Sequence, residues 1–185
     1  LIGSTSGDDL TGHGGANRID GRGGDDSLSG LQGDDELIGQ GGHDRLSGGD
    51  GFDIIVGGTG NDTIIGGGHR DELTGSAGAD SFVFFPGQLT DARGEADVIT
   101  DFAATGGDLI NLRLVDAKDS TPESDDAFTF IGTSAFSGNG VGGELRYQIV
   151  EGNTLVSGDI DGDGTAEFYI RLNGPVELTA SDFVL

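Results

Sequence analysis

A nine-residue repeat fills the first half of the chain and constrains its fold more than any other feature. From Gly3 to Val83 the sequence divides into nine consecutive nonapeptides, called nonads below, with no insertion. In order they read GSTSGDDLT, GHGGANRID, GRGGDDSLS, GLQGDDELI, GQGGHDRLS, GGDGFDIIV, GGTGNDTII, GGGHRDELT and GSAGADSFV. A fixed period of this kind predicts a solenoid, in which each repeat is a small unit that buries its apolar face against its neighbours.

Four positions of the nonad carry the pattern. Position one is always glycine, and position four is glycine in seven nonads, with Ser6 and His69 as the exceptions. Position eight is always a large apolar residue: Leu10, Ile19, Leu28, Leu37, Leu46, Ile55, Ile64, Leu73 and Phe82. Position six holds a carboxylate or an amide: Asp8, Asn17, Asp26, Asp35, Asp44, Asp53, Asp62, Asp71 and Asp80.

This pattern has a direct physical interpretation. Glycines let the first six residues of each nonad form a tight turn, and the last three residues form a short strand. The apolar residue in the middle of that strand points inward, so stacked nonads share a thin core. The sixth-position side chain and the carbonyls of the turn offer only oxygen ligands, which favour Ca²⁺ over zinc or copper.

Composition supports a cation-binding chain. The sequence has 33 acidic residues against nine lysines and arginines, a formal net charge of −24. Such a surface repels nucleic acids and anionic membranes. The chain has 38 glycines and no cysteine, so neither disulfides nor thiolate metal sites are available. Two alternatives are a flexible Gly/Asp-rich linker and a solenoid without metal; the regular register opposes the first, and repulsion between stacked aspartates opposes the second.

The nonads are not equivalent. Ser6 and Asn17 depart from the pattern in the first two nonads, and nonad eight places His69 and Arg70 in its turn. We expect the site shared by nonads six and eight to be the weakest, and those of nonads three to seven and nine to be the best. A zinc site of His13, His43 and His69 is the alternative use of the histidines. They occupy different positions of their nonads, so we expect exposed loop residues instead.

The nonads resemble the RTX repeat GGxGxDxUx, which binds Ca²⁺ in solenoid proteins. The resemblance implies a parallel β-roll with two nonads per turn. It also implies that each Ca²⁺ lies between nonad i and nonad i+2 on one edge of the roll, which allows at most seven such pairs.

After the nonads, strand-like runs such as ADVITDF, GDLINLRLV, AFTFIG, GELRYQIV, NTLVSGDI and AEFYIRL alternate with turn residues. Ser120–Asp126 is polar and predicts a loop. Residues 97–185 resemble the C-terminal domain of serralysin-type metalloproteases. The resemblance implies an all-β chain, with a parallel β-roll (β-solenoid) over 1–85 capped by a C-terminal antiparallel β-sandwich over 86–185. Carried over from the family, Asp91 and Asp97 would hold a Ca²⁺ at the end of the roll.

Two further motifs lie near the C-terminus. Asp159, Asp161 and Asp163 alternate as in the start of an EF-hand loop, but Ile170 stands where the loop's bidentate glutamate belongs. The alternatives are a further cation site and a simple hairpin turn. Asp182-Phe183-Val184-Leu185, an acidic residue before three apolar ones, resembles the secretion signal of the serralysin group. The alternative is an edge strand.

Together these features predict a calcium-binding module that takes up several Ca²⁺ ions and has no catalytic site. We expect a secreted, extracellular monomer that supports type I secretion of an effector, such as a serralysin-like protease, whose catalytic domain would precede Leu1. Expected partners are that effector and the type I secretion apparatus, with no nucleic acid and no membrane. No signal peptide or bilayer-spanning apolar run is visible. The alternatives are an adhesin and a polysaccharide-binding module like the R-modules of alginate epimerases. The identity of the effector, the number of occupied sites and any carbohydrate ligand stay open.

Overall fold

The computed structural model describes residues 1–115, 127–140 and 142–185, and these residues form two β-sheets with two short 3₁₀ helices, η1 (Ala104–Gly106) and η2 (Ala180–Asp182). One sheet runs in the order β1 (Asp9–Thr11), β3 (Ser27–Gln32), β5 (Arg45–Asp50), β7 (Thr63–Gly68), β9 (Ser81–Val83), β11 (Leu109–Asn111) and β16 (Phe183–Val184). The other runs in the order β12 (Thr129–Phe130), β13 (Glu144–Val150), β14 (Asn153–Asp159), β15 (Phe168–Leu172), β10 (Val98–Ile99), β8 (Glu72–Ala77), β6 (Ile54–Thr59), β4 (Glu36–Gly41) and β2 (Arg18–Gly23).

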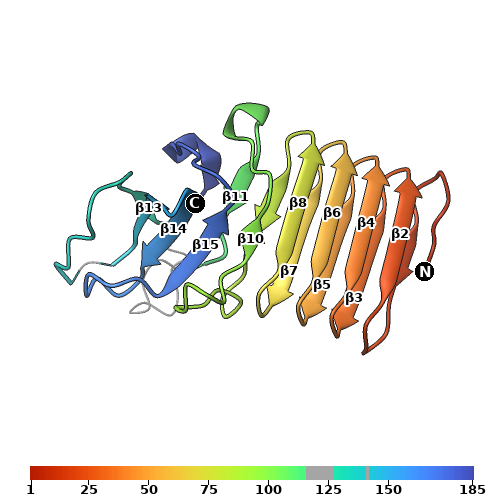
Figure 1. Ribbon diagram of the computed structural model, residues 1–185, viewed down its shortest axis with the longest axis horizontal. Coiled ribbons are helices and arrows are strands. Elements are labelled where there is room, and N and C mark those ends of the chain that lie inside the picture. The colour runs from red at the N-terminus through yellow and green to blue at the C-terminus, as the bar shows by residue number, and fades with distance from the viewer. Residues whose placement is uncertain (116–126, 141) are drawn as a thin grey trace.

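The nonads form the predicted parallel β-solenoid. Strands that begin in odd-numbered nonads lie in one sheet and strands that begin in even-numbered nonads lie in the other, so each strand pairs in parallel with the strand two nonads away. Leu28, for example, lies opposite Leu46, which lies opposite Ile64. Figure 1 shows these strands side by side, from β2 near the N-terminus to β8 at the middle of the molecule. The expectation of two nonads per turn is therefore confirmed.

The strands of the roll are longer than the three residues predicted. Strand β3 covers Ser27–Gln32, which is positions seven to nine of one nonad and positions one to three of the next. Pairing continues past Gly30, because Leu31 lies opposite Gly49 and Gln32 opposite Asp50. The left-handed backbone at Leu31 (φ 83°) bends the strand without ending it. The turn is thus confined to positions four to six.

The core of the roll is the column of position-eight side chains. From Ile19 to Phe82 these side chains are 0–1% exposed, whereas Leu10 in the first nonad is only partly buried. Each nonad buries essentially one large apolar residue, and burial of such a side chain contributes roughly 1.5–3 kcal/mol. This core is narrow, so the roll depends on whatever else holds its turns together.

The sheets of the roll continue into the C-terminal half. Strand β10 pairs in parallel with β8 and β15, while β11 pairs in parallel with β9 and β16. The antiparallel part within the described residues consists of β13, β14 and β15. Tyr147 of β13 and Phe168 of β15, together with Phe128 just before β12, belong to a larger aromatic core. The division into domains at residues 85 and 86 stays a prediction, and the loop predicted at Ser120–Asp126 lies outside the described residues.

The described segments contain no helix with the length and apolar character needed to cross a membrane.

Candidate calcium sites

An aspartate ladder runs along each edge of the roll. In nonads one to seven, the backbone N–H of the position-six residue donates a hydrogen bond to Oδ1 of the aspartate two nonads later. Asp26 donates to Asp44 at 2.8 Å and Asp44 donates to Asp62 at 2.9 Å on one edge. On the other edge, Asp35 donates to Asp53 at 2.8 Å. The shared strand register sets this alignment, because each aspartate immediately precedes the first residue of a strand.

The second carboxylate oxygen of seven ladder residues has no partner. Oδ2 is buried and accepts no hydrogen bond in Asp26, Asp35, Asp44, Asp53, Asp62, Asp71 and Asp80. These side chains are 1–3% exposed. An unpaired buried carboxylate oxygen costs several kcal/mol unless a proton or a cation compensates it. Seven repeated cases indicate a cation position in the turns of nonads three to nine.

The glycine at position one of the nonad leaves the space in which such a cation would lie. A Cβ on Gly30 would lie 2.2 Å from Oδ2 of Asp35 and 2.7 Å from the carbonyl oxygen of Gly48. A Cβ on Gly39 would lie 2.3 Å from Oδ2 of Asp44 and 2.6 Å from the carbonyl oxygen of Gly57. A carboxylate and a carbonyl from neighbouring turns therefore converge where any side chain would intrude. An all-oxygen ligand set of this kind is the one that Ca²⁺ prefers in proteins.

Burial raises the pKa of the ladder carboxyls. It raises the pKa of Asp53 and of Asp80 to about 6, and the pKa of Asp97 to about 7. The pKa of Asp71 rises to about 8, mainly because of burial and also because of the charges of Asp97 and Asp53. Without a cation, these groups therefore hold protons at pH values at which free aspartates are ionised.

The first two nonads differ from the rest, as their sequences predicted. Oδ2 of Asp8 accepts hydrogen bonds from the backbone N–H and the hydroxyl of Ser4. The amide of Asn17 donates to the carbonyl oxygens of His13 and Gly15 and so turns an N–H₂ group toward the turn. These residues lie in the ladder, but their free oxygens are already used or replaced.

The ladder extends beyond the nonads. The N–H of Asp71 donates to Oδ1 of Asp97 at 2.8 Å, and the N–H of Asp80 donates to Oδ1 of Asp108 at 3.0 Å. Sequence reasoning missed Asp108, although Asp108-Leu109-Ile110 repeats the spacing of positions six to eight. On the edge of Asp97 the ladder then stops, because the strand register places the buried, apolar Ile170 at the next position.

Asp91 lies apart from this arrangement. It is exposed and borders a shallow pocket with Thr165 and Glu167. The structure thus brings Asp97 into the ladder and places Asp91 beside the β14–β15 loop. The end-of-roll site predicted for this pair stays a prediction.

Nonad eight keeps the ladder geometry despite its unusual turn. The N–H of Asp53 donates to Oδ1 of Asp71 at 2.9 Å, as in the other rungs. His69 takes the left-handed backbone of position four (φ 74°), a conformation that is strained for a residue with a Cβ. Arg70 is exposed, and its charge lowers the pKa of Asp97 against the larger effect of burial. Weaker binding at this site stays a prediction.

The histidines are exposed, as expected for loop residues. The His43 ring accepts a hydrogen bond from the N–H of Asn61, and His69 lies 5.7 Å from the ring of Phe52. The described residues do not bring the three histidines together.

The loop between β14 and β15 gathers four carboxylates. Ligand oxygens of Asp159, Asp161, Asp163 and Glu167 all lie within 4.8 Å of one another. The hairpin turn was one of the two alternatives from the sequence, and the antiparallel pairing of β14 with β15 shows it. Glu167 joins the three predicted residues by accepting a hydrogen bond from the N–H of Ile160. Binding of a cation there stays a prediction.

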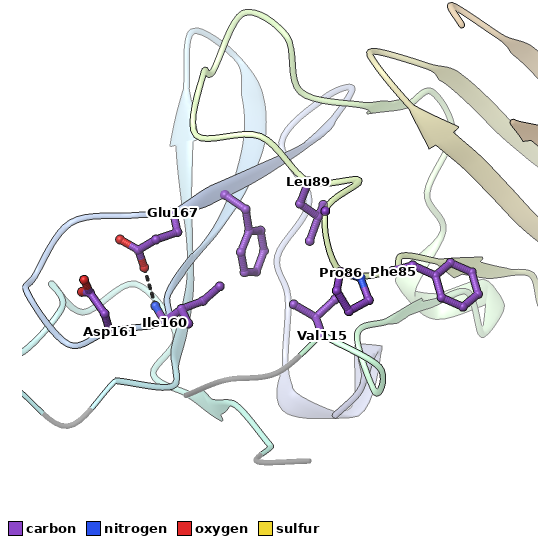
Figure 2. Close-up of a pocket in the computed structure, with 9 residues that line it drawn as sticks. Phe85, Pro86, Leu89, Val115, Ile160, Asp161 and Glu167 are labelled. Atoms are coloured by element: carbon purple, nitrogen blue, oxygen red, sulfur yellow. Dashed lines mark hydrogen bonds between the residues drawn. The ribbon is translucent and has the colours of Figure 1, made fainter. Parts of the chain in front are cut away.

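An apolar pocket of about 310 Å³ adjoins this loop. Figure 2 shows the carboxylates of Asp161 and Glu167 at one end of the pocket, with Leu89, Pro86 and Val115 toward the other. Burial, and then the charges of neighbouring aspartates, raise the pKa of Glu167. The pocket lies where the connecting segment after β9 meets the β14–β15 loop.

Comparisons with known proteins show which family the chain belongs to. The family model described as Peptidase M10 serralysin C terminal matches residues 17–185. A solved structure of the AlgE6R2 subunit of the Azotobacter vinelandii mannuronan C5-epimerase is 26% identical, covering 86% of this chain and 91% of its own, with a TM-score of 0.45. The AlgE6R3 subunit of the same epimerase is 22% identical, covering 98% of this chain and 80% of its own, with a TM-score of 0.40. Comparison with curated proteins gives no match.

Proposed function

Because the chain belongs to the peptidase M10 serralysin C-terminal family, we propose that it is a calcium-dependent folding module that supports secretion of an effector joined to it. The family is that of the C-terminal, RTX-type repeat domain and not of the catalytic protease domain. The proposal assigns the chain to the extracellular space, with the type I secretion apparatus as its partner during export.

One observation carries the calcium part of this proposal. Seven buried aspartate oxygens without a hydrogen-bond partner each lie in a turn that only glycine can complete. In each turn the ladder aspartate would hold Ca²⁺ together with carbonyl oxygens of its neighbours. Such a bound cation supplies the positive charge that the ladder carboxylates need.

The acidic composition supports the link to export. Where Ca²⁺ is scarce, a chain with a net charge of −24 and a narrow core stays unfolded and can pass through a secretion channel. Extracellular modules bind Ca²⁺ with dissociation constants of roughly 10⁻⁴–10⁻³ M. Outside the cell, millimolar Ca²⁺ would then stabilise the folded form by mass action.

The calcium content of the chain tests this proposal. After equilibration with ~1 mM Ca²⁺, elemental analysis should find about seven ions per chain, one for each unpaired oxygen. Two or fewer ions would contradict pairing along the ladder. Gly48→Ala should lose at least one ion, because its Cβ would lie 2.1 Å from Oδ2 of Asp53 and 2.6 Å from the carbonyl oxygen of Gly66.

Gly94→Ala is the matched control, because nothing lies within 4 Å of the position where its Cβ would be. It should bind as many ions as the unmodified chain. Equal calcium content in the Gly48 and Gly94 variants would show that the glycine-lined turns do not hold the ions.

We also propose that Asp182–Leu185 is read as an export signal before the chain folds. In the folded chain Phe183 and Val184 form β16 and pair with β11, and Asp182 is buried and accepts a hydrogen bond from the N–H of Thr179. The edge-strand alternative is therefore realised in the folded state. Asp182 and Phe183 become fully accessible to an export apparatus only when the chain is unfolded, which fits secretion ahead of folding.

Removal of residues 182–185 should abolish export of the chain from cells that carry a type I apparatus. The readout is the amount of chain in the medium relative to the cells, and the Gly94→Ala chain should be exported normally. Undiminished export of the shortened chain would exclude these residues as the signal.

A further inference from the structure

The outer face of the antiparallel strands carries a pocket unlike the rest of this acidic chain. Strands β13, β14 and β15 lie side by side at the end of the molecule away from the nonads (Figure 1), and Arg146, Ser157 and Tyr169 lie opposite one another across them. A pocket of about 250 Å³ opens over these residues, and Arg93 and Phe136 complete its walls. None of its lining residues is acidic.

Both arginines of the pocket are stacked on aromatic rings. Cζ of Arg93 lies 5.0 Å from the ring centroid of Tyr169, and Cζ of Arg146 lies 5.3 Å from that of Phe136. A guanidinium that contacts a ring face through its Cζ can still donate N–H groups to a planar anion. The Nε atom of Arg146 is buried and has no hydrogen-bond partner. Nε of Arg171, which lies outside the pocket, is also buried and unpartnered, so the site is identified by its two arginines and its lining and not by this atom alone.

Neither arginine of the pocket forms a salt bridge with a neighbouring acid in the described part of the chain. Within the described part of the chain, the one salt bridge joins Arg18 and Glu36 in the roll. Glu144 lies on the same face, two residues before Arg146, but its carboxylate accepts a hydrogen bond from the N–H of Ser137. The pocket thus concentrates two unpaired positive charges in a chain that has only nine lysines and arginines.

We propose that this pocket binds a small hydroxylated carboxylate of the sugar-acid class. The guanidinium groups of Arg93 and Arg146 match the planar carboxylate. Gln148, Ser157 and Thr165 also line the pocket, and they offer neutral donors and acceptors to hydroxyl groups. The volume is just below the range of ~300–1,000 Å³ typical of small-molecule sites, so the ligand is compact. The acidic surroundings disfavour nucleic acids, whose charge density is far higher.

Titration of the Ca²⁺-loaded full chain with glucuronate tests this assignment, followed by amide NMR shifts and by calorimetry. Ca²⁺ is kept in excess, so that chelation by the ligand leaves the ladder loaded. We expect a dissociation constant on the order of 1 mM and shifts centred on Gln148, Ser157 and Thr165. Glucose, which lacks the carboxylate, and acetate, which lacks the hydroxyls, should each bind at least ~10-fold more weakly. The affinity of a short oligouronate is compared with that of glucuronate. Tighter binding of the oligouronate would assign a sugar-acid residue within a polymer as the ligand, and weaker binding would assign a free sugar acid.

Arg146→Lys keeps the charge but loses the planar pair of donors, and it should weaken glucuronate binding ~10-fold or more. Arg171→Lys is the matched control. Arg171 lies on the outer face of β15, two residues beyond Tyr169, but does not line the pocket. Circular dichroism with Ca²⁺ verifies that both variants are folded. Equal binding of glucose and glucuronate, equal affinities of the two lysine variants, or no shifts in these amides at ~50 mM glucuronate would overturn the proposal.

Discussion

Chelation of Ca²⁺ at pH 7.5 should remove most of the strand signal from the circular dichroism spectrum, and added Ca²⁺ should restore it. Ladder carboxylates on successive rungs are about one strand spacing apart, ~4.8 Å. Two ionised groups at that separation repel by on the order of 3 kcal/mol at an effective dielectric constant of ~20. Several such pairs exceed the ~5–15 kcal/mol that stabilises a typical domain. A chain equally folded with and without chelator would contradict a structural role for the cation.

The aspartate ladder also makes this Ca²⁺-dependent folding vary with pH. Folding of the Ca²⁺-free chain raises the pKa of Asp44 and Asp53 to about 6 and of Asp71 to about 8, above the ~3.9 of an unfolded aspartate. Groups shifted in this direction make the folded form most stable below the unfolded pKa, and that contribution is lost as pH rises through about 6 to 8. The Ca²⁺-free chain should therefore regain strand signal between pH 8 and pH 5.5. Because Ca²⁺ must displace these protons, the Ca²⁺ midpoint should move to higher concentrations over the same interval.

Removal of everything after Val83 should leave the nonads unfolded at Ca²⁺ concentrations that fold the whole chain. Strands β10 and β11 cover the last turn, where Val98 donates to the carbonyl of Asp71 and Leu109 to that of Asp80. Without them Leu73 and Phe82, both 0% exposed in the whole chain, face solvent. The loss is roughly 1.5–3 kcal/mol for each side chain, which is large against a core of one residue per nonad. Repeat arrays need such caps.

A chain that lacks residues 1–11 is the control for this experiment. It loses one nonad from the other end, where Leu10 is already partly exposed, so its Ca²⁺ midpoint should change little. The readout for both shortened chains is strand signal during a Ca²⁺ titration. Capping by the C-terminal half would be wrong if residues 1–83 folded at the same midpoint as the whole chain.

The nonads could be interpreted from the sequence because their spacing is strict. With one apolar residue and one aspartate at fixed phases, pairing by whole nonads aligns both columns at once, and the resemblance to the RTX repeat implied that nonad i pairs with nonad i+2. The strict spacing did not predict the ladder partners of Asp71 and Asp80. Asp97 and Asp108 lie 26 and 28 residues further on, instead of 18, because loops are inserted between the turns. Asp97 was proposed as a ligand only through a family resemblance, and Asp108 was not proposed at all.

Other features depend on contacts that no local pattern encodes. Alternation predicts that Phe168–Leu172 is a strand, but not that it pairs with Val98–Ile99 and so extends a sheet of the roll. The strands were underestimated because the first six residues of each nonad were assigned to the turn, whereas positions one to three continue the strand past a left-handed residue such as Leu31. The arginine pocket combines Arg93, Phe136 and Arg146 from three separate segments, so its composition is visible only in the folded chain.

The repeat is nine residues long, but the ladder joins residues 18 apart. Odd and even changes in the number of nonads therefore have different effects on the structure. Insertion or deletion of one nonad would move every later nonad to the opposite sheet and rotate the C-terminal half by half a turn relative to Leu1. A change of two nonads would restore the original orientation and only lengthen or shorten the roll. The number of nonads therefore sets an angle as well as a length, and it determines which way the Arg93–Arg146 pocket faces relative to whatever is joined before the roll.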